Sequence, residues 1–297
     1  MRVSMRPVKL PRVVEVALFV APAGAVTVEA LAARLDATPN RAREIAEEMV
    51  RMGLLGRSDG GYASTSAGRR LIDEIAADRW PLVHEEFMAY PFYRDFFTTL
   101  DKLPSATYNE LLELLREGET HFNLATVDNL SEWAERLGSV QRNPYTKQIY
   151  TLRESNQPLV PSFLAAYSRL KREPYAKLKP RRVTSVAPPA PPPWSGTRYV
   201  EIGHLREMIC QELRCARPSF DRRFASLCTQ NIGRLELSGV PITSTTNKSR
   251  YRVRTVSVMA LPSQLVMDFD TAYYEKGIAI NGRMYSLLAY HGGDLRE

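Results

Sequence analysis

The sequence contains few of the residues that metal centres, disulfide frameworks and covalent catalysis depend on. Its 297 residues include only three cysteines and four histidines. A small, odd number of cysteines without paired spacing favours reduced thiols and a cytoplasmic protein. His204 lies near Cys210, Cys215 and Cys228 in the sequence, but no C-x-x-C pair occurs. We therefore expect buried structural cysteines and no metal site, with a zinc site as the alternative.

Long apolar runs are also missing. No stretch approaches the roughly 18 apolar residues that a transmembrane helix needs, so no membrane association is expected. The apolar stretch 13–25 follows basic residues, as a signal peptide would, but Glu15 and Pro22 interrupt it. Its periodicity fits a helix of the protein core better than a targeting segment.

The sequence lacks the patterns of the common catalytic sites. It has no G-x-S-x-G and no glycine-rich loop followed by Lys and Ser or Thr, and His84 has no second histidine at zinc-protease spacing. We therefore expect a protein that is not an enzyme and needs no cofactor. One alternative stays open, because Asp268 and Asp270 share one face of an expected strand near Glu275, as in a divalent-dependent nuclease.

Charge is present in quantity but is unevenly distributed. Of the net +7, residues 1–79 carry twelve Lys/Arg against ten Asp/Glu, and residues 80–157 carry seven against twelve. Residues 158–197 carry seven against one, and residues 198–297 carry fourteen against ten. Basic segments attract nucleic acid, whereas the acidic middle segment is better suited to a protein partner.

The most informative stretch is residues 27–74. Apolar spacing predicts one helix from Val28 and a second after Thr38, which is a suitable N-cap before Pro39. The turn sequence at 58–61 lies between two short extended segments and predicts a β-hairpin. A closing helix is expected to begin at Thr65.

This order of elements, carried by MVRMGLLGR, a turn and GYASTSAGRRL, resembles the winged helix-turn-helix family, especially its bacterial and archaeal regulators. The resemblance implies double-stranded DNA binding in most small regulators and protein docking in others.

On DNA, the helix 40–52 would enter the major groove. The residues that could then read bases or hold phosphates are Asn40, Arg41 and Arg43. The carboxylates expected to oppose phosphate on this helix are Glu44, Glu47 and Glu48. An ordinary solvated helix face of mixed charge is the alternative.

Two later segments are expected to repeat this order. Residues 80–173 predict three helices and a hairpin around Asn143, with Thr126 or Asp128 as the cap of the third helix. Residues 198–297 begin with an expected helical stripe that includes Tyr199. We therefore predict a mainly α protein with short β-hairpins, in which tandem winged-helix domains are joined by a Pro-rich linker. The predicted parts are 1–79, 80–173, a basic linker at 174–197, and 198–297.

The C-terminal domain has the stronger electrostatic case for nucleic acid. One expected helix exposes Arg222 and Arg223, and a long hairpin is expected across residues 235–256. Strict alternation places three arginines on one face of its return strand, preceded by a lysine at its tip. These residues are Lys248, Arg250, Arg252 and Arg254. Phosphate contacts would give affinity without sequence choice, and the alternative is a charged edge that prevents aggregation.

The predicted function is binding of double-stranded DNA, either as a transcriptional regulator or as the DNA-recognition subunit of a DNA-processing or antiviral defence complex. In the second case the acidic middle domain would hold a protein partner, and a homodimer is also compatible with the sequence. The competing prediction is a protein-interaction scaffold that uses winged helices to bridge subunits of a larger complex.

Overall fold

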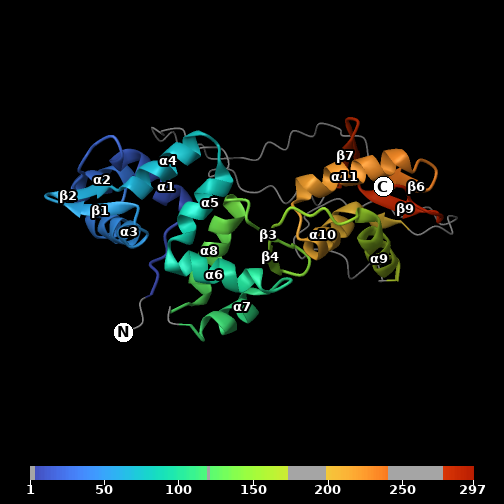
Figure 1. Ribbon diagram of the computed structural model, residues 1–297, viewed down its shortest axis with the longest axis horizontal. Coiled ribbons are helices and arrows are strands. Elements are labelled where there is room, and N and C mark those ends of the chain that lie inside the picture. Colours follow the sequence, from blue (N-terminus) through green and yellow to red (C-terminus); the bar gives the residue numbers. More distant parts are fainter. Residues whose placement is uncertain (1–3, 119–120, 173–198, 240–276) are drawn as a thin grey trace. The chain divides into compact units, whose positions relative to one another are not determined.

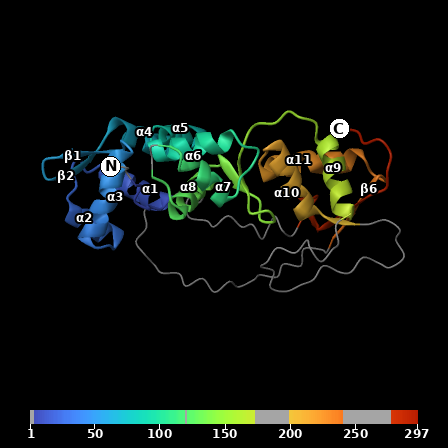
Figure 2. The same cartoon turned by 90° about the horizontal axis from the view of Figure 1, so that it is seen from below.

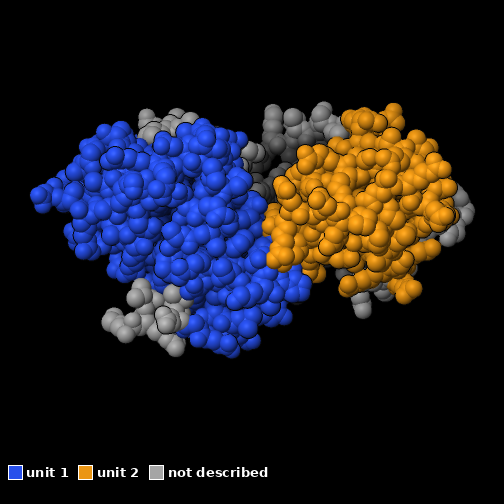
Figure 3. Space-filling view, in the orientation of Figure 1, with its two compact units in different colours: residues 1–142, 149–151, 255–268 blue, residues 143–148, 152–254, 269–297 orange. Residues whose placement is uncertain are grey.

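A computed structural model describes residues 4–118, 121–172, 199–239 and 277–297. These residues form eleven helices and several short antiparallel sheets of two or three strands. They divide into two compact units, which Figure 3 colours separately. Unit 1 contains the described residues up to 142 together with 149–151, and unit 2 contains 143–148 and the described residues from 152 onwards. In the described ranges, no helix has the length and apolar character required to cross a membrane.

Unit 1 begins with three helices, a hairpin and a fourth helix (Figure 1). They are α1 (Leu10–Val20), α2 (Val28–Leu35), α3 (Pro39–Arg51), β1 (Leu55–Ser58), β2 (Gly61–Ser64) and α4 (Ser66–Ala76). The predicted cap at Thr38 is confirmed, and Thr27 and Thr65 cap their helices in the same way: each of the three side chains accepts a hydrogen bond from the backbone amide three residues ahead. Each cap satisfies an amide that the first helical turn leaves unpaired.

The rest of unit 1 adds four helices and a second hairpin. These are α5 (Trp80–Met88), α6 (Pro91–Asp101), α7 (Tyr108–Leu115), α8 (Leu124–Arg136), β3 (Val140–Arg142) and β4 (Ile149–Thr151). The cap of α8 is Asn123, which accepts from the amide of Thr126, so the expected cap at Thr126 or Asp128 was wrong. One hydrophobic cluster runs from Met5 to Ile149, so both hairpins of unit 1 pack on a continuous core.

The described part of unit 2 contains three helices, a three-stranded sheet and a two-stranded sheet. Its elements are α9 (Leu159–Arg172), β5 (Val200–Glu201), α10 (Ile202–Leu213), α11 (Arg217–Gln230), β6 (Leu235–Ser238), β7 (Ile278–Ile280), β8 (Arg283–Tyr285) and β9 (Leu287–Tyr290). Figure 2 shows the three helices grouped together. The prediction that Tyr199 belongs to the first helix of this segment was wrong. The chain is extended up to Glu201, and the helix begins at Ile202. The described partner of β6 is β9, and the expected partner strand at 250–256 lies outside the described residues.

The same sheet order occurs three times in the described chain. Each time, the segment just before the second helix of a group pairs with the later of two antiparallel strands, and that strand also pairs with the earlier one. In the first group, Val26 and Tyr62 exchange two backbone hydrogen bonds of 2.9 Å. In the second, Ala106 and Ile149 do so at 2.9 and 2.8 Å. In unit 2 the corresponding order is β5–β9–β6. We refer to these groups as module 1 (residues 10–76), module 2 (the described residues of 91–142, with 149–151) and module 3 (the described residues between 159 and 290).

Candidate nucleic-acid interface

The segment before α1 determines which face of α3 is available to a partner. Residues 4–9, the N-terminal strap, pass between α3 and α8 (Figure 1). Arg41 and Arg51 of α3 donate to the strap carbonyls of Pro7 and Ser4, at 2.7 and 3.1 Å. From the other side, the side chains of Asn129 and Trp133 donate to the carbonyl of Val8, at 2.7 and 2.9 Å. These bonds hold the strap as part of unit 1.

Glu48 lies on this inner side of α3 and is fully buried. Its carboxylate accepts hydrogen bonds from the Tyr90 hydroxyl, from an Arg51 guanidinium N–H at 3.2 Å, and from the Arg6 backbone amide at 3.2 Å. Burial, followed by the bond to Glu48, raises the pKa of Tyr90 well above its ordinary range. The expectation that Glu48 opposes phosphate on the solvent face was therefore wrong, because this carboxylate is an internal acceptor.

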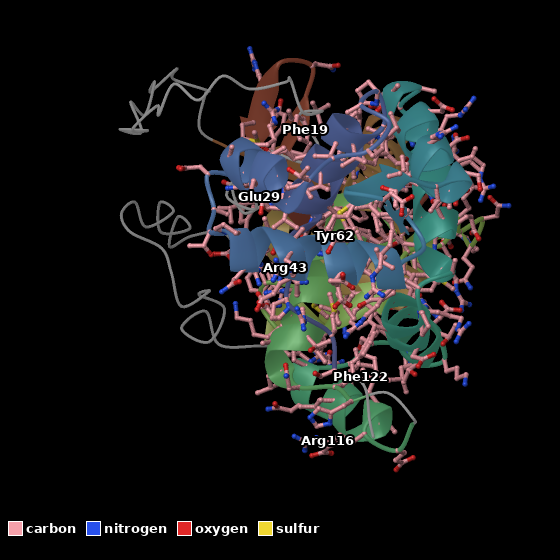
Figure 4. The ribbon with its side chains drawn as sticks, turned by 90° about the vertical axis from the view of Figure 1, so that its left-hand side faces the viewer. Phe19, Glu29, Arg43, Tyr62, Arg116 and Phe122 are labelled. Atoms are coloured by element: carbon pink, nitrogen blue, oxygen red, sulfur yellow. The ribbon has the colours of Figure 1, made fainter. Side chains whose placement is uncertain are left out.

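The outer face of α3 is formed by Asn40, Arg43, Glu44 and Glu47. Asn40 and Arg43 are exposed, as expected for residues that meet a partner. Arg41 is also exposed in part, but its guanidinium is shared between Glu44, at 2.9 Å, and the strap. Figure 4 views this end of the molecule and labels Arg43 on α3 close to Tyr62 of the hairpin. The structure thus places the three predicted residues on one helix and leaves two of them directed at solvent.

Glu47 connects this face to the hairpin. Its carboxylate accepts two hydrogen bonds from the Arg57 guanidinium, at 2.6 and 3.3 Å, and one from the Tyr62 hydroxyl at 2.8 Å. The Arg57 bond is the main cause that lowers the pKa of Glu47, and burial followed by the bond to Glu47 raises that of Tyr62. Two parallel bonds from one guanidinium fix geometry as well as charge. The hairpin is therefore held at a defined angle to α3.

Two further arginines belong to this site and were not predicted from the sequence. Arg57 of β1 has a side chain 72% exposed. Arg6 of the strap is exposed, and its charge acts with that of Arg57 to lower the pKa of Glu47. Arg43 lies four residues before Glu47 on α3, and its charge acts on Tyr62, the hydroxyl donor to Glu47. Arg6, Arg43 and Arg57 together form a basic cluster drawn from the strap, α3 and the hairpin. Sequence spacing could not reveal it, because these residues meet only when the strap and hairpin pack on α3.

In unit 2 the predicted arginines differ in their roles. Arg222 on α11 is exposed, as expected. Arg223 was expected to be exposed as well, but it donates to the carbonyls of Ser155 and Gln157, at 3.5 and 2.5 Å, and to the Glu297 carboxylate at 3.0 Å. It therefore ties α11 to the end of the chain. Lys248, Arg250, Arg252 and Arg254 lie outside the described residues.

Other arginines of unit 2 are internal. Arg206 is fully buried and donates to Asp221 at 2.6 Å, and buried Arg217 forms a two-point pair with Glu207 at 2.5 and 2.8 Å. A buried charge is tolerated only with such pairing. The count of basic residues in this part of the chain is therefore larger than the number of positive charges exposed on its described surface.

The surface of module 2 is acidic and includes the apolar side chains of Leu114 and Leu124, 41% and 50% exposed. Exposed carboxylates here include Glu113 on α7, Glu117 in the turn after it and Asp128 on α8. Residues 143–148, which link β3 to β4 in the sequence, belong to unit 2: Asn143 donates to the Gln211 side chain at 2.6 Å, and Tyr145 stacks on His204 with ring centroids 4.2 Å apart.

The residues considered for metal binding or catalysis do not assemble a site in the described ranges. All three cysteines are buried, and burial raises the pKa of Cys228 to about 12. Within the part of the chain that the structure describes, no group of three or more His, Cys, Asp or Glu side chains could hold a metal ion. Asp268, Asp270 and Glu275 lie outside it.

Comparison with known proteins adds no relative: no protein-family model, no curated protein and no solved structure matches this chain.

Proposed function

We propose that this chain is a tandem winged-helix protein that binds double-stranded DNA, with α3 and the β1–β2 hairpin of module 1 as a contact surface. The observation that carries the proposal is the basic cluster of Arg6, Arg43 and Arg57, in which Arg57 pairs with Glu47 while the charges of Arg6 and Arg43 act on Glu47 and Tyr62 respectively. It lies on an exposed helix that follows a short turn and precedes a hairpin, the arrangement in which winged helices present a recognition helix.

In this proposal, Asn40 and Arg43 face the base edges of the major groove, since Asn and Arg pair with adenine and guanine there. Arg57 on the hairpin contacts the phosphate backbone of the DNA. This is possible because a guanidinium has five N–H donors and the two-point pair with Glu47 uses only two of them. Arg6 extends the positive surface along the strap. Arg222, and the basic residues at 248–254, supply a second, sequence-independent contact from the C-terminal part of the chain.

The acidic surface of module 2 supports a role for this protein within a larger assembly. Carboxylates repel phosphate, whereas Leu114 and Leu124 offer apolar surface to a protein. The protein would accordingly act as a transcriptional regulator or as the DNA-recognition subunit of a DNA-processing or defence complex. The second candidate, a scaffold that bridges subunits without binding DNA, is favoured by the same surface.

Gel-shift titration of random-sequence duplex DNA over a series of salt concentrations separates the two candidates. The DNA proposal predicts binding at low salt that weakens as salt rises. Replacing Arg43 with Gln should weaken binding and alter sequence preference, because this residue is directed at bases. The matched control is Arg69→Gln, which removes an equal charge from an exposed position on α4. Absence of binding at low salt would refute the DNA proposal and leave the scaffold.

A further inference from the structure

Two cysteines lie at the two ends of the hydrogen bond that closes α10. The backbone of Arg214, directly after the helix, is left-handed with φ 52°. The amide of the next residue, Cys215, donates to the carbonyl oxygen of Cys210 at 3.1 Å. This arrangement ends many helices, and it commonly brings the side chains of the two bonded residues into contact.

The end of α4 has the same backbone arrangement and shows this side-chain contact directly. There Asp78 is left-handed with φ 57°, and the amide of Arg79 donates to the carbonyl oxygen of Glu74 at 2.9 Å. The side chains of Glu74 and Arg79 form an ion pair. At the end of α10, the corresponding contact is a hydrogen bond from the Cys210 thiol to the sulfur of Cys215. The two sulfur atoms are therefore neighbours in the folded protein.

The two thiols differ in their chemical properties. The hydrogen bond from Cys210, assisted by the positive charge of Arg223, lowers the pKa of Cys215. Burial, followed by the same hydrogen bond, raises the pKa of Cys210 well above its ordinary range. The thiolate is the form of cysteine that reacts with oxidants. Cys215 thus has the properties of an attacking sulfur, and Cys210 those of a second thiol that can complete a disulfide.

Cys215 also has the more accessible position of the two. It lies in the turn 214–216 between α10 and α11, with a side chain 3% exposed, whereas Cys210 is fully buried within α10. Local opening of turns and helix ends requires far less free energy than global unfolding. Hydrogen peroxide is close to water in size, so it needs only such an opening to reach Cys215.

We propose that Cys210 and Cys215 form a disulfide in response to hydrogen peroxide, as a reversible modification site at the end of α10. The Cys215 thiolate attacks one oxygen of the peroxide, so an S–O bond forms, the O–O bond breaks, and hydroxide leaves and takes up the proton that this thiol released. The sulfur, oxidised by two electrons, is now a sulfenic acid. The Cys210 sulfur then attacks the Cys215 sulfur.

In this second step the S–S bond forms, the S–O bond breaks, and the departing hydroxide takes the Cys210 proton to give water. Overall, two thiols and one peroxide give one disulfide and two molecules of water. The bond would covalently fix the turn between α10 and α11, and a dithiol reductant would reverse it. The site does not depend on the DNA-binding proposal.

Mass spectrometry of the full-length protein tests the site. The reduced, folded protein is treated with hydrogen peroxide, and the remaining thiols are then blocked with N-ethylmaleimide in denaturant. We expect a loss of about 2 Da and a single blocked thiol, that of Cys228, with the disulfide mapped to Cys210 and Cys215. Cys228 is the matched control, because burial raises its pKa to about 12. Cys228→Ser should form the same disulfide to the same extent.

Dimedone, which captures sulfenic acids, tests the order of the two steps. Cys210→Ser should stop at the sulfenic acid of Cys215 and be labelled, whereas Cys215→Ser should be neither labelled nor oxidised to a disulfide. The proposal is overturned if peroxide leaves all three thiols of the unmodified protein reactive with N-ethylmaleimide, or if Cys228 enters the disulfide as readily as Cys215 does. Those two results come from the unmodified protein and do not require any variant to fold.

Discussion

Two neighbouring glutamates on α3, Glu47 and Glu48, have opposite environments and therefore opposite roles. Glu48 is fully buried and accepts hydrogen bonds from a tyrosine, an arginine and a backbone amide. Glu47 lies at the surface and holds the hairpin through Arg57 and Tyr62. A helix turns by about 100° per residue, so one step along it is enough to move a side chain from solvent to core. The role of each carboxylate follows from what packs on its side of the helix.

Replacing Glu48 with Ala should lower the free energy of unfolding by about 3 kcal/mol, because the Tyr90 hydroxyl and the Arg6 amide would be left without an acceptor. Urea unfolding monitored by tryptophan fluorescence measures the change. The control is Glu44→Ala on the same helix, where a side chain 44% exposed should change stability by less than about 0.5 kcal/mol. Equal effects of the two variants would contradict the internal role of Glu48.

Glu47 should make the stability of the protein depend on acid pH. Its pKa is lowered in the folded state, chiefly by the Arg57 hydrogen bond. A lowered folded pKa means that its contribution is complete above the unfolded pKa and is lost as pH falls through the folded value. The stability difference between the unmodified protein and Glu47→Gln should thus shrink between about pH 6 and about pH 3. Urea unfolding at both pH values measures it, and a constant difference would argue against this carboxylate–guanidinium pair.

At the scale of elements, α4 closes module 1 by packing closely against the hairpin. Gly68 makes this possible: a Cβ there would lie 2.2 Å from the Leu54 carbonyl oxygen and 2.8 Å from the Ser64 hydroxyl oxygen. The nearer neighbour is backbone and cannot rotate away. Glycine in a helix has an entropic cost, which here is offset by close approach of helix and strand. The stretch GYASTSAGRRL therefore needs a glycine at position 68 for close packing, in addition to the threonine that caps its helix.

Gly68→Ala should destabilise the protein by about 1–3 kcal/mol, the range expected for an overpacked contact. Gly56→Ala in β1 is the matched control, because a Cβ there would meet only the Thr65 methyl at 3.8 Å, an ordinary contact. That variant should stay within about 0.5 kcal/mol of the unmodified protein. Thermal unfolding followed by circular dichroism measures both, and similar melting temperatures for the two variants would contradict the close packing of α4.

At the scale of the whole molecule, the three modules share a sheet order but differ in charge. Module 1 offers a basic cluster, whereas module 2 offers carboxylates and exposed leucines. In module 3, Arg206, Arg217 and Arg223 are used internally. A repeated architecture therefore does not imply a repeated function, since function depends on the side chains that each copy exposes.

The distribution of charge leads to a prediction for DNA affinity. Changing Arg250, Arg252 and Arg254 together to Ala should weaken binding to all duplex sequences alike and reduce the salt slope by ~3, since each arginine that neutralises a phosphate contributes about one to the slope. Fluorescence anisotropy with two unrelated duplexes at several salt concentrations measures both effects.

The control for this triple variant is Arg94, Lys102 and Arg116 changed to Ala, which removes the same net charge from exposed positions of the acidic segment. It should leave the slope nearly unchanged, because these residues lie among carboxylates that repel phosphate. Equal slopes for the two triple variants would indicate that net charge, and not the position of the charges, governs binding.

Local elements of the fold were predictable from the sequence because local chemistry decides them. The caps at Thr27, Thr38 and Thr65 follow from hydroxyl side chains before apolar periodicity, and the first hairpin follows from its turn residues. The cap of α8 was mispredicted, because Thr126 and Asp128 have the same capping chemistry as the residue that does cap it, Asn123. Where several cap residues follow one another, local chemistry does not choose between them.

The sequence by itself thus determined a mainly helical chain with short hairpins, and it indicated Asn40 and Arg43 as solvent-facing residues of α3. Only the tertiary structure decided the surroundings of α3. Tyr90 meets Glu48 across 42 residues of sequence, and the strap meets α8 across more than a hundred. Contacts at such separations depend on which surfaces pack together, and periodicity along a single helix carries no information about that packing. The buried state of Glu48 and the basic cluster of Arg6, Arg43 and Arg57 both arise from this packing.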